Sequence, residues 1–282
     1  MPNWDFLLNA REQTGFSTDV LEDIFIKYGG METPIKTRKS LSQFLEFCKG
    51  YSTYRMFTFT REKRSFRSVC TKIKRILNYL YVVVNELEVA FLNRLSSQNS
   101  VNIGISSINQ STLIVDTFPI YINRPSRHQN LFYNGKYKGH VLKVQVFCDH
   151  QANIIFFSGP HLGCTHDVQI FYDNHPLISV DEKILADKAY CGNRAKNMGI
   201  IAPHKKSINN DFTTEESNFN AIHGFYRSRV EHSIGYLKRF SILSQRYRGR
   251  VVGKSYPDIS KFVKVLIHLN YMQTSKYPIR RI

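Results

Sequence analysis

The segment TLIVDTFPI, residues 112–120, places the strongest restriction on how this chain can fold. Apolar residues stand at both odd and even positions on either side of Asp116, a pattern that predicts a strand covered on both faces in the middle of a sheet. An ionised carboxylate in such a strand costs several kcal/mol unless a partner compensates its charge. We therefore expect Asp116 to have a partner, and our hypothesis is that this partner is a metal ion.

The patterns that follow residue 111 predict a sheet with helices packed on it. Strands are expected at residues 139–149, 152–159 and 183–190, and the segment MGIIAP predicts a further short strand. Helices are expected over the segment THDVQIFYDN and at residues 222–246 and 258–273. This order of elements predicts an α/β fold, with a mixed sheet and helices on its faces.

The N-terminal third of the chain has the apolar spacing of helices. The clearest patterns are residues 41–49 and a longer stretch that begins near Ser65 and is basic in its first half. Two short helices followed by a basic third helix resemble a helix-turn-helix module, whose last helix enters the major groove of DNA. A helical bundle with a solvated basic face is the alternative. In the helix-turn-helix interpretation, the residues expected to contact DNA are Arg64, Arg67 and Lys72.

Composition shifts along the chain predict a division into two domains. Residues 1–95 form the small all-α, helix-turn-helix-like region, and residues 96–110, rich in Ser and Asn, have the composition of a linker. The α/β domain is expected to span residues 111–282.

The formal net charge of +17 indicates a polyanionic partner, and nucleic acid is the usual one. No apolar run of eighteen or more residues and no signal-peptide pattern is present, so we expect no membrane partner. The five cysteines include no C-x-x-C pair, which favours a reducing compartment.

Tyr133 and Tyr190 are candidates for stacking on unpaired bases, with core packing as the alternative. Basic candidates for neutralising DNA phosphates are Lys136, Lys138, Lys143, Arg227, Arg229, Lys238, Arg239, Arg246, Arg248 and Arg250.

Three more acidic residues stand where a buried or element-terminal position is expected. Asp187 ends the predicted strand ILADKAY, Glu231 lies in the predicted helix SRVEHSIGYLKRF, and Asp167 opens the helix of THDVQIF. Carboxylates on adjoining strands and a helix can share Mg²⁺ or Mn²⁺, which prefer oxygen ligands. Asp167 is a metal ligand or a helix cap, and the pattern does not choose between them.

Two basic residues accompany Glu231 at helical spacing. Arg227 lies four residues before it and Lys238 seven after, which predicts a common stripe on one helix. An acid between two bases suits a site that holds both metal and phosphate. The spacing by itself is weak, because ion pairs four residues apart are common on solvated helices.

Several segments together resemble the DDE transposases, specifically the Harbinger/PIF and IS5-like group. The matching segments span about residues 112–245 in the family's order: IVDTF, YNGKYKGHVLKVQVFCD, SGPHLGCTHDVQIF, ILADKAYCG and RVEHSIGYLKRF. The resemblance implies an RNase H-like catalytic domain whose acidic triad falls on Asp116, Asp187 and Glu231, with Asp167 as a further metal-ligand candidate.

The resemblance also implies an activity and partners. Members of this family hydrolyse DNA at the ends of a transposable element, using Mg²⁺ or Mn²⁺, and join the freed 3′-hydroxyl to target DNA. Holding two DNA ends implies a homo-oligomer, and the eukaryotic branch often works with a Myb-like DNA-binding partner in the nucleus. A bacterial insertion element would leave the protein in the cytoplasm. The alternatives are a domesticated transposase that binds DNA without cutting it, and a nuclease of the same fold that does not join strands.

Overall fold

The computed structural model describes residues 4–7, 9–61, 65–88, 111–176, 182–206, 211–250 and 255–279. The chain separates into two compact units. The first, which we call the helical unit, contains residues 1–86, 120–123 and 237–276. The second, which we call the sheet unit, contains residues 87–119, 124–236 and 277–282. None of the described helices is long and apolar enough to cross a membrane.

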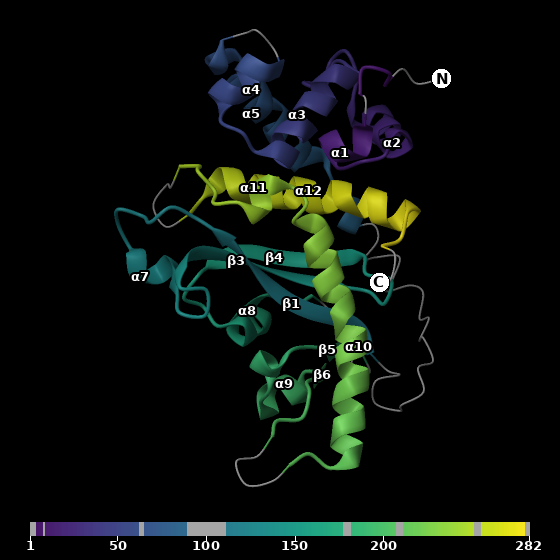
Figure 1. The fold of residues 1–282 in the computed structure, drawn as a ribbon, viewed down its shortest axis with the longest axis vertical. Coiled ribbons are helices and arrows are strands. Elements are labelled where there is room, and N and C mark those ends of the chain that lie inside the picture. Colours follow the sequence, from purple (N-terminus) through teal and green to yellow (C-terminus); the bar gives the residue numbers. More distant parts are fainter. Residues whose placement is uncertain are drawn as a thin grey trace. The chain divides into compact units, whose positions relative to one another are not determined.

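One six-stranded sheet organises the second unit (Figure 1). The strand order is β2-β3-β1-β5-β6, and β4 pairs with β3. Strand β3 is antiparallel to β2 and β4, whereas β5 is parallel to β1 and to β6, so the sheet is mixed, as the sequence predicts. The strands are β1 (Ser111–Tyr121), β2 (Tyr133–Asn134), β3 (Gly139–Cys148), β4 (Ile154–Leu162), β5 (Lys183–Leu185) and β6 (Ile200–Ile201).

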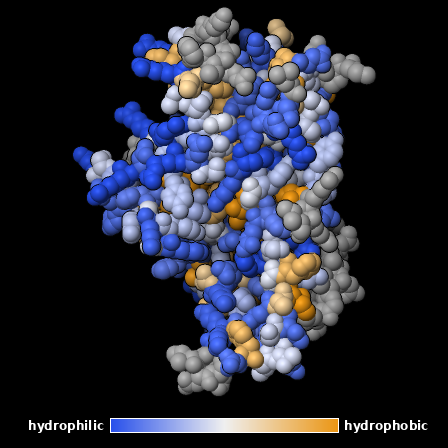
Figure 2. Space-filling view, viewed as in Figure 1, coloured by the Kyte–Doolittle hydropathy of each residue, from blue (hydrophilic) through white to orange (hydrophobic). Residues whose placement is uncertain are grey.

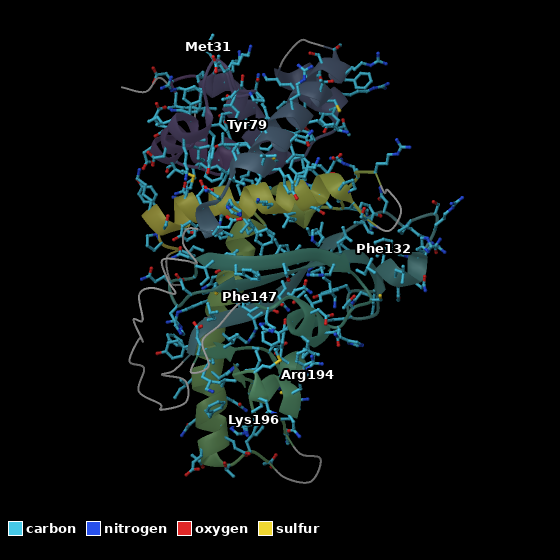
Figure 3. The ribbon with its side chains drawn as sticks, turned by 180° about the vertical axis from the view of Figure 1, so that it is seen from behind. Met31, Tyr79, Phe132, Phe147, Arg194 and Lys196 are labelled. Carbon is cyan, nitrogen blue, oxygen red and sulfur yellow. The ribbon has the colours of Figure 1, made fainter. Side chains whose placement is uncertain are left out.

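The helices of the sheet unit pack on this sheet. Phe147 of β3 lies in the core, with its ring 6.2 Å from that of Phe171 in α8 (Figure 3). The long helix α10 runs across the strands (Figure 1), and the hydroxyl of Ser233 donates to the carbonyl of Ala152 at 2.6 Å, which ties α10 to the turn between β3 and β4. The helical segments are α7 (Gln129–Phe132), α8 (Asp167–Asn174), η1 (Lys188–Tyr190), α9 (Asn193–Asn197) and α10 (Thr214–Leu237).

The helical unit combines the N-terminal helices with the last helix of the chain. Helix α12 packs against α5 and α2. Its Phe262 ring stacks on that of Phe44 in α3, with 6.2 Å between the ring centres, and its Lys276 pairs with Asp19 and Asp23 of α2. The helices are α1 (Ala10–Thr14), α2 (Thr18–Tyr28), α3 (Arg38–Gly50), α4 (Tyr54–Arg61), α5 (Phe66–Val83), α11 (Ser241–Ser244) and α12 (Pro257–Lys276). The predicted domain boundaries stay a prediction, because the linker at residues 96–110 lies outside the described residues.

Two predicted elements have different ends in the structure. The strand expected at residues 183–190 stops at Leu185, because the side chain of Asp187 accepts a hydrogen bond from the Lys188 N–H and caps the 3₁₀ segment η1. The helix expected at residues 222–246 is α10, which begins at Thr214 behind a reciprocal cap between Thr213 and Glu216. It ends at Leu237, since the chain turns there before α11, although the apolar spacing continues beyond it.

Candidate active site

Strand pairing brings Asp116 and Asp187 to the same edge of the sheet. Strands β1 and β5 are parallel neighbours, and Ile114 lies opposite Leu185. Two residues further along each chain are Asp116 and Asp187. This register places both residues near the carboxyl end of β5, and the charge of Asp187 acts on the Asp116 carboxyl.

Asp116 lies in the apolar environment that its sequence predicts. Leu113, Ile114 and Val115 are fully buried, and the Asp116 side chain is 24% exposed. The pKa of Asp116 is raised to about 6, chiefly by burial, with smaller contributions from the negative charges of Asp187 and Asp167. The backbone N–H of Thr117, 2.7 Å from Oδ1, and the guanidinium of Arg227 oppose this rise. Asp187 and Asp167 are therefore close enough to Asp116 to act on it electrostatically.

Asp167 has a buried cation as its partner. Lys143 Nζ lies 2.8 Å from Asp167 Oδ1 and donates a second hydrogen bond to the carbonyl of Thr165 at 2.6 Å. The two side chains are only 5% and 10% exposed. The expectation that Lys143 neutralises DNA phosphates is therefore wrong, since its ammonium is enclosed and already paired with a carboxylate.

Helix α10 presents Glu231 and Arg227 together. The Arg227 guanidinium is 2.5 Å from Glu231 Oε1, and its other terminal nitrogen is 3.9 Å from Asp116 Oδ2. One cation thus faces two of the predicted metal ligands, and Glu231 is 53% exposed. Lys238 directly follows Leu237, the last residue of α10, so its place on this stripe stays a prediction.

The donor set suits a hard divalent cation, although the side chains do not form a closed cage. Among the described residues, no group of three or more His, Cys, Asp or Glu side chains is arranged to hold a metal ion. Asp116 and Asp187 nevertheless supply only oxygen donors at one sheet edge, as Mg²⁺ and Mn²⁺ prefer. Their mutual repulsion is also the electrostatic situation that a cation relieves. The oxygen donors of Asp116 and Asp187 therefore suit such an ion in their chemistry, and the full set of metal ligands stays a prediction.

Sequence reasoning missed one buried residue beside the acids. Gln145 of β3 is fully buried and donates hydrogen bonds to the hydroxyl of Tyr190 and to the backbone carbonyl of Asp167. The rule that singles out Asp116 would have found it, because Gln145 is also a polar residue within an apolar strand, VLKVQVF. Tyr190 itself is 1% exposed, so it is a core residue and not a platform for bases.

The remaining basic candidates differ in exposure. Lys136 and Lys138 are exposed in the turn between β2 and β3, and Arg67 is exposed at the start of α5. Lys72 is half-buried and donates to Gln43 of α3, and Arg64 lies outside the described residues. The face drawn in Figure 2 is predominantly hydrophilic, in keeping with the high net charge.

Arg229 is not available for a phosphate contact. It is 8% exposed, and its guanidinium lies 4.4 Å from the centre of the Tyr226 ring. The expectation that it neutralises DNA is therefore wrong, because the helix packs this side chain inward.

A mixed sheet with flanking helices is consistent with the fold of a DDE nuclease. Residues 115–270 match the family described as DDE superfamily endonuclease, and this is more than half of the 282-residue chain. The chain belongs to this family. Nucleases of this superfamily generally use divalent metal ions.

A curated relative points in the same direction. The chain is 30% identical over 141 residues to the probable transposase for insertion sequence element IS702 of Microchaete diplosiphon. The alignment covers 50% of this chain and 51% of the relative, so the chain spans about half the length of the relative it matches. No solved structure matches the chain. These matches support the IS5-like side of the predicted resemblance and do not assign the Harbinger/PIF group.

Proposed function

We propose that this protein is a metal-dependent DNA endonuclease of the transposase type, which hydrolyses phosphodiester bonds at the ends of a transposable element and joins the freed 3′-hydroxyl to target DNA. The observation that carries the proposal is the placement of Asp116 in β1 and of Asp187 two residues beyond the end of the parallel neighbour β5, where the charge of Asp187 adds to the raised pKa of Asp116. The family match over residues 115–270 includes both acids and Glu231.

The proposal gives each acidic residue a role. Asp116, Asp187 and Glu231 are the catalytic metal ligands, and a bound Mg²⁺ or Mn²⁺ would activate the attacking water and stabilise the leaving oxygen. Asp167, paired with Lys143, supports the negative field of the site, and direct ligation by Asp167 is the alternative.

Arg227 would act as a counter-ion. It faces both Asp116 and Glu231. Because a guanidinium binds phosphate with the same donors that it offers to a carboxylate, Arg227 can contact a DNA phosphate once cations occupy the acids. The protein then contributes positioning and charge rather than a covalent nucleophile.

The proposal extends to DNA-binding surfaces and partners. Helices α3 to α5 would form the helix-turn-helix-like region that binds DNA through Arg64, Arg67 and Lys72. The exposed Lys136 and Lys138 would add phosphate contacts. Holding two DNA ends requires a homo-oligomer. The IS702 relative favours the cytoplasmic location of an insertion-element protein, and neither a nuclear location nor a Myb-like partner gains support from it.

Cleavage of supercoiled DNA that carries the sequences flanking this gene tests the proposal. We expect purified protein to nick these flanks with Mg²⁺ or Mn²⁺ but not with EDTA, and we expect Asp116→Asn and Asp187→Asn to remove the activity. Asp173→Asn is the matched control, because Asp173 is an exposed acid of α8 whose carboxylate accepts a hydrogen bond from Gln169. DNA binding without cleavage would instead support the domesticated DNA-binding protein. Nicks without insertion products would support the nuclease that does not join strands.

A further inference from the structure

A buried polar cluster lies beneath the predicted acids. Its centre is Gln145, whose Nε2 is 2.9 Å from the Tyr190 hydroxyl and 3.1 Å from the carbonyl oxygen of Asp167. The Tyr190 hydroxyl is in turn 3.0 Å from Thr117 Oγ1. Gln145 and Tyr190 are 0% and 1% exposed, and Thr117 is 5% exposed. We call these residues, Thr117, Gln145 and Tyr190, the polar cluster.

Each contact of the cluster reaches a segment that carries one of the acids. Thr117 follows Asp116 in β1, and its backbone N–H donates to the Asp116 carboxylate. The Asp167 carbonyl belongs to the first residue of α8. Tyr190 closes the 3₁₀ segment that Asp187 caps, and its N–H donates to the Asp187 carbonyl at 2.9 Å. Strand β3 thus joins three acid-bearing segments through one side chain.

Gln145 is the donor in the hydrogen bonds at the centre of the cluster. Its amide group has two N–H donors, and its Nε2 donates to Tyr190 and Asp167 and lies 3.4 Å from Thr117 Oγ1. The hydroxyls of Thr117 and Tyr190 share a further hydrogen bond, in which either can be the donor. Burial raises the pKa of Tyr190 well above its ordinary value, so its hydroxyl stays protonated. Within the described part of the chain, Gln145 Oε1 accepts no hydrogen bond.

The cluster counteracts a force that would otherwise separate the acids. The negative charges of Asp167 and Asp187 act on Asp116, and like charges in a partly buried site repel one another. Hydrogen bonds in a low-dielectric interior are directional and costly to break. Gln145 and Tyr190 are only 0% and 1% exposed, so their side chains do not reach a substrate or a metal ion themselves.

We propose that Gln145 and Tyr190 are positioning residues, which hold the segments of Asp116, Asp167 and Asp187 at the separation that a divalent cation requires. The proposal rests on the proposed function, because it concerns the same acids. Ordinary core packing is the competing explanation, and it predicts lower stability but unchanged affinity for the cation.

Direct Mn²⁺ binding to the full chain, measured without DNA by electron paramagnetic resonance, separates the two explanations. Outer hydrogen-bond partners of metal ligands typically change metal affinity by about 10–100-fold, so we expect Tyr190→Phe and Gln145→Met each to weaken Mn²⁺ binding at least about tenfold. Tyr247→Phe is the matched control, because it removes a hydroxyl from a buried tyrosine of the helical unit, and it should bind Mn²⁺ as the wild type does. Asp116→Asn and Asp187→Asn serve as references for lost binding.

The outcomes distinguish the positioning proposal from the proposed function. If the acid variants lose Mn²⁺ but folded Tyr190→Phe binds within about twofold of the wild type, the cluster is core packing and the positioning proposal is overturned. If the wild type binds no Mn²⁺, or the acid variants bind equally well, the proposed function fails and the positioning proposal fails with it. Tyr190→Phe removes a single oxygen atom, so the test stands even if Gln145→Met does not fold.

Discussion

The replacement Lys143→Met tests how strongly the interior of the sheet unit depends on one ion pair. Lys143 Nζ donates to the Thr165 carbonyl at 2.6 Å and to Asp167 Oδ1 at 2.8 Å. The side chains of Lys143 and Asp167 are 5% and 10% exposed. Methionine fills a similar volume but cannot donate, so the variant leaves a carboxylate and a carbonyl without their donor.

The expected loss of stability follows from the Asp167 carboxylate and the Thr165 carbonyl, which no longer have a donor. Removing one partner of a buried ion pair costs about 3–5 kcal/mol, because the other charge stays buried. An unsatisfied buried carbonyl costs about 1–3 kcal/mol, and water that enters the site offsets part of both terms. We therefore expect Lys143→Met to lower the free energy of unfolding by about 4 kcal/mol. Adding Asp167→Asn removes the stranded charge, so the double variant should recover about 2 kcal/mol or more.

Urea unfolding at pH 7, followed by far-ultraviolet circular dichroism, measures these values. Fluorescence of the single tryptophan is unsuitable, because Trp4 lies in the helical unit. The reasoning is refuted if Lys143→Met loses less than about 1 kcal/mol and if Asp167→Asn has the same effect in both backgrounds. Such a result would mean that solvent screens this pair.

Three further predictions address other parts of the molecule. Burial raises the pKa of Glu86, but hydrogen bonds from neighbours that include His268 outweigh it and lower the pKa from 4.5 to about 2. The folded state therefore binds a proton at Glu86 less tightly than the unfolded state does. We expect Glu86→Gln to be about 3 kcal/mol less stable than the wild type at pH 7, and this difference in stability should shrink as the pH falls from 4.5 toward 2. A difference that stays constant in urea titrations across this range would contradict the pairing. A Cβ at Gly163 would lie 2.5 Å from the Val141 carbonyl oxygen, so Gly163→Ala should lower the free energy of unfolding by about 2 kcal/mol or more. Gly135→Ala is the control, because a Cβ there meets nothing within 4 Å, and its midpoint of urea unfolding should equal that of the wild type. Replacing the exposed Lys136 and Lys138 by Gln should lower the slope of log affinity for DNA against log salt by about 2, and an unchanged slope would exclude them from the interface.

The local pattern of apolar residues was sufficient to predict several helices and strands. The apolar run around Asp116 predicts β1 as a covered strand, and its residues 113–115 are fully buried. Strands β3 and β4, helix α8 and helix α12 also lie close to their predicted positions. Asp116 could be selected as a candidate because an acid in a strand covered on both faces is costly wherever the strand lies.

The sequence by itself thus indicated most of the strands and helices, the mixed sheet and the acids as candidates, because periodicity and the cost of burying charge act within a segment. It did not indicate β2, and it placed the end of β5 too late. Only the tertiary structure decided which charges meet. Lys143 and Asp167 are 24 residues apart, and Tyr190 meets Thr117 across 73. Likewise, Arg227 reaches Asp116 from a different element of the fold. The end of α10 at Leu237 and the cap formed by Asp187 also depend on the folded chain, because the apolar spacing and the strand pattern both continue beyond them. The physical reason is that an ion pair or a buried hydrogen bond depends on distance in space, which no local pattern of residues records.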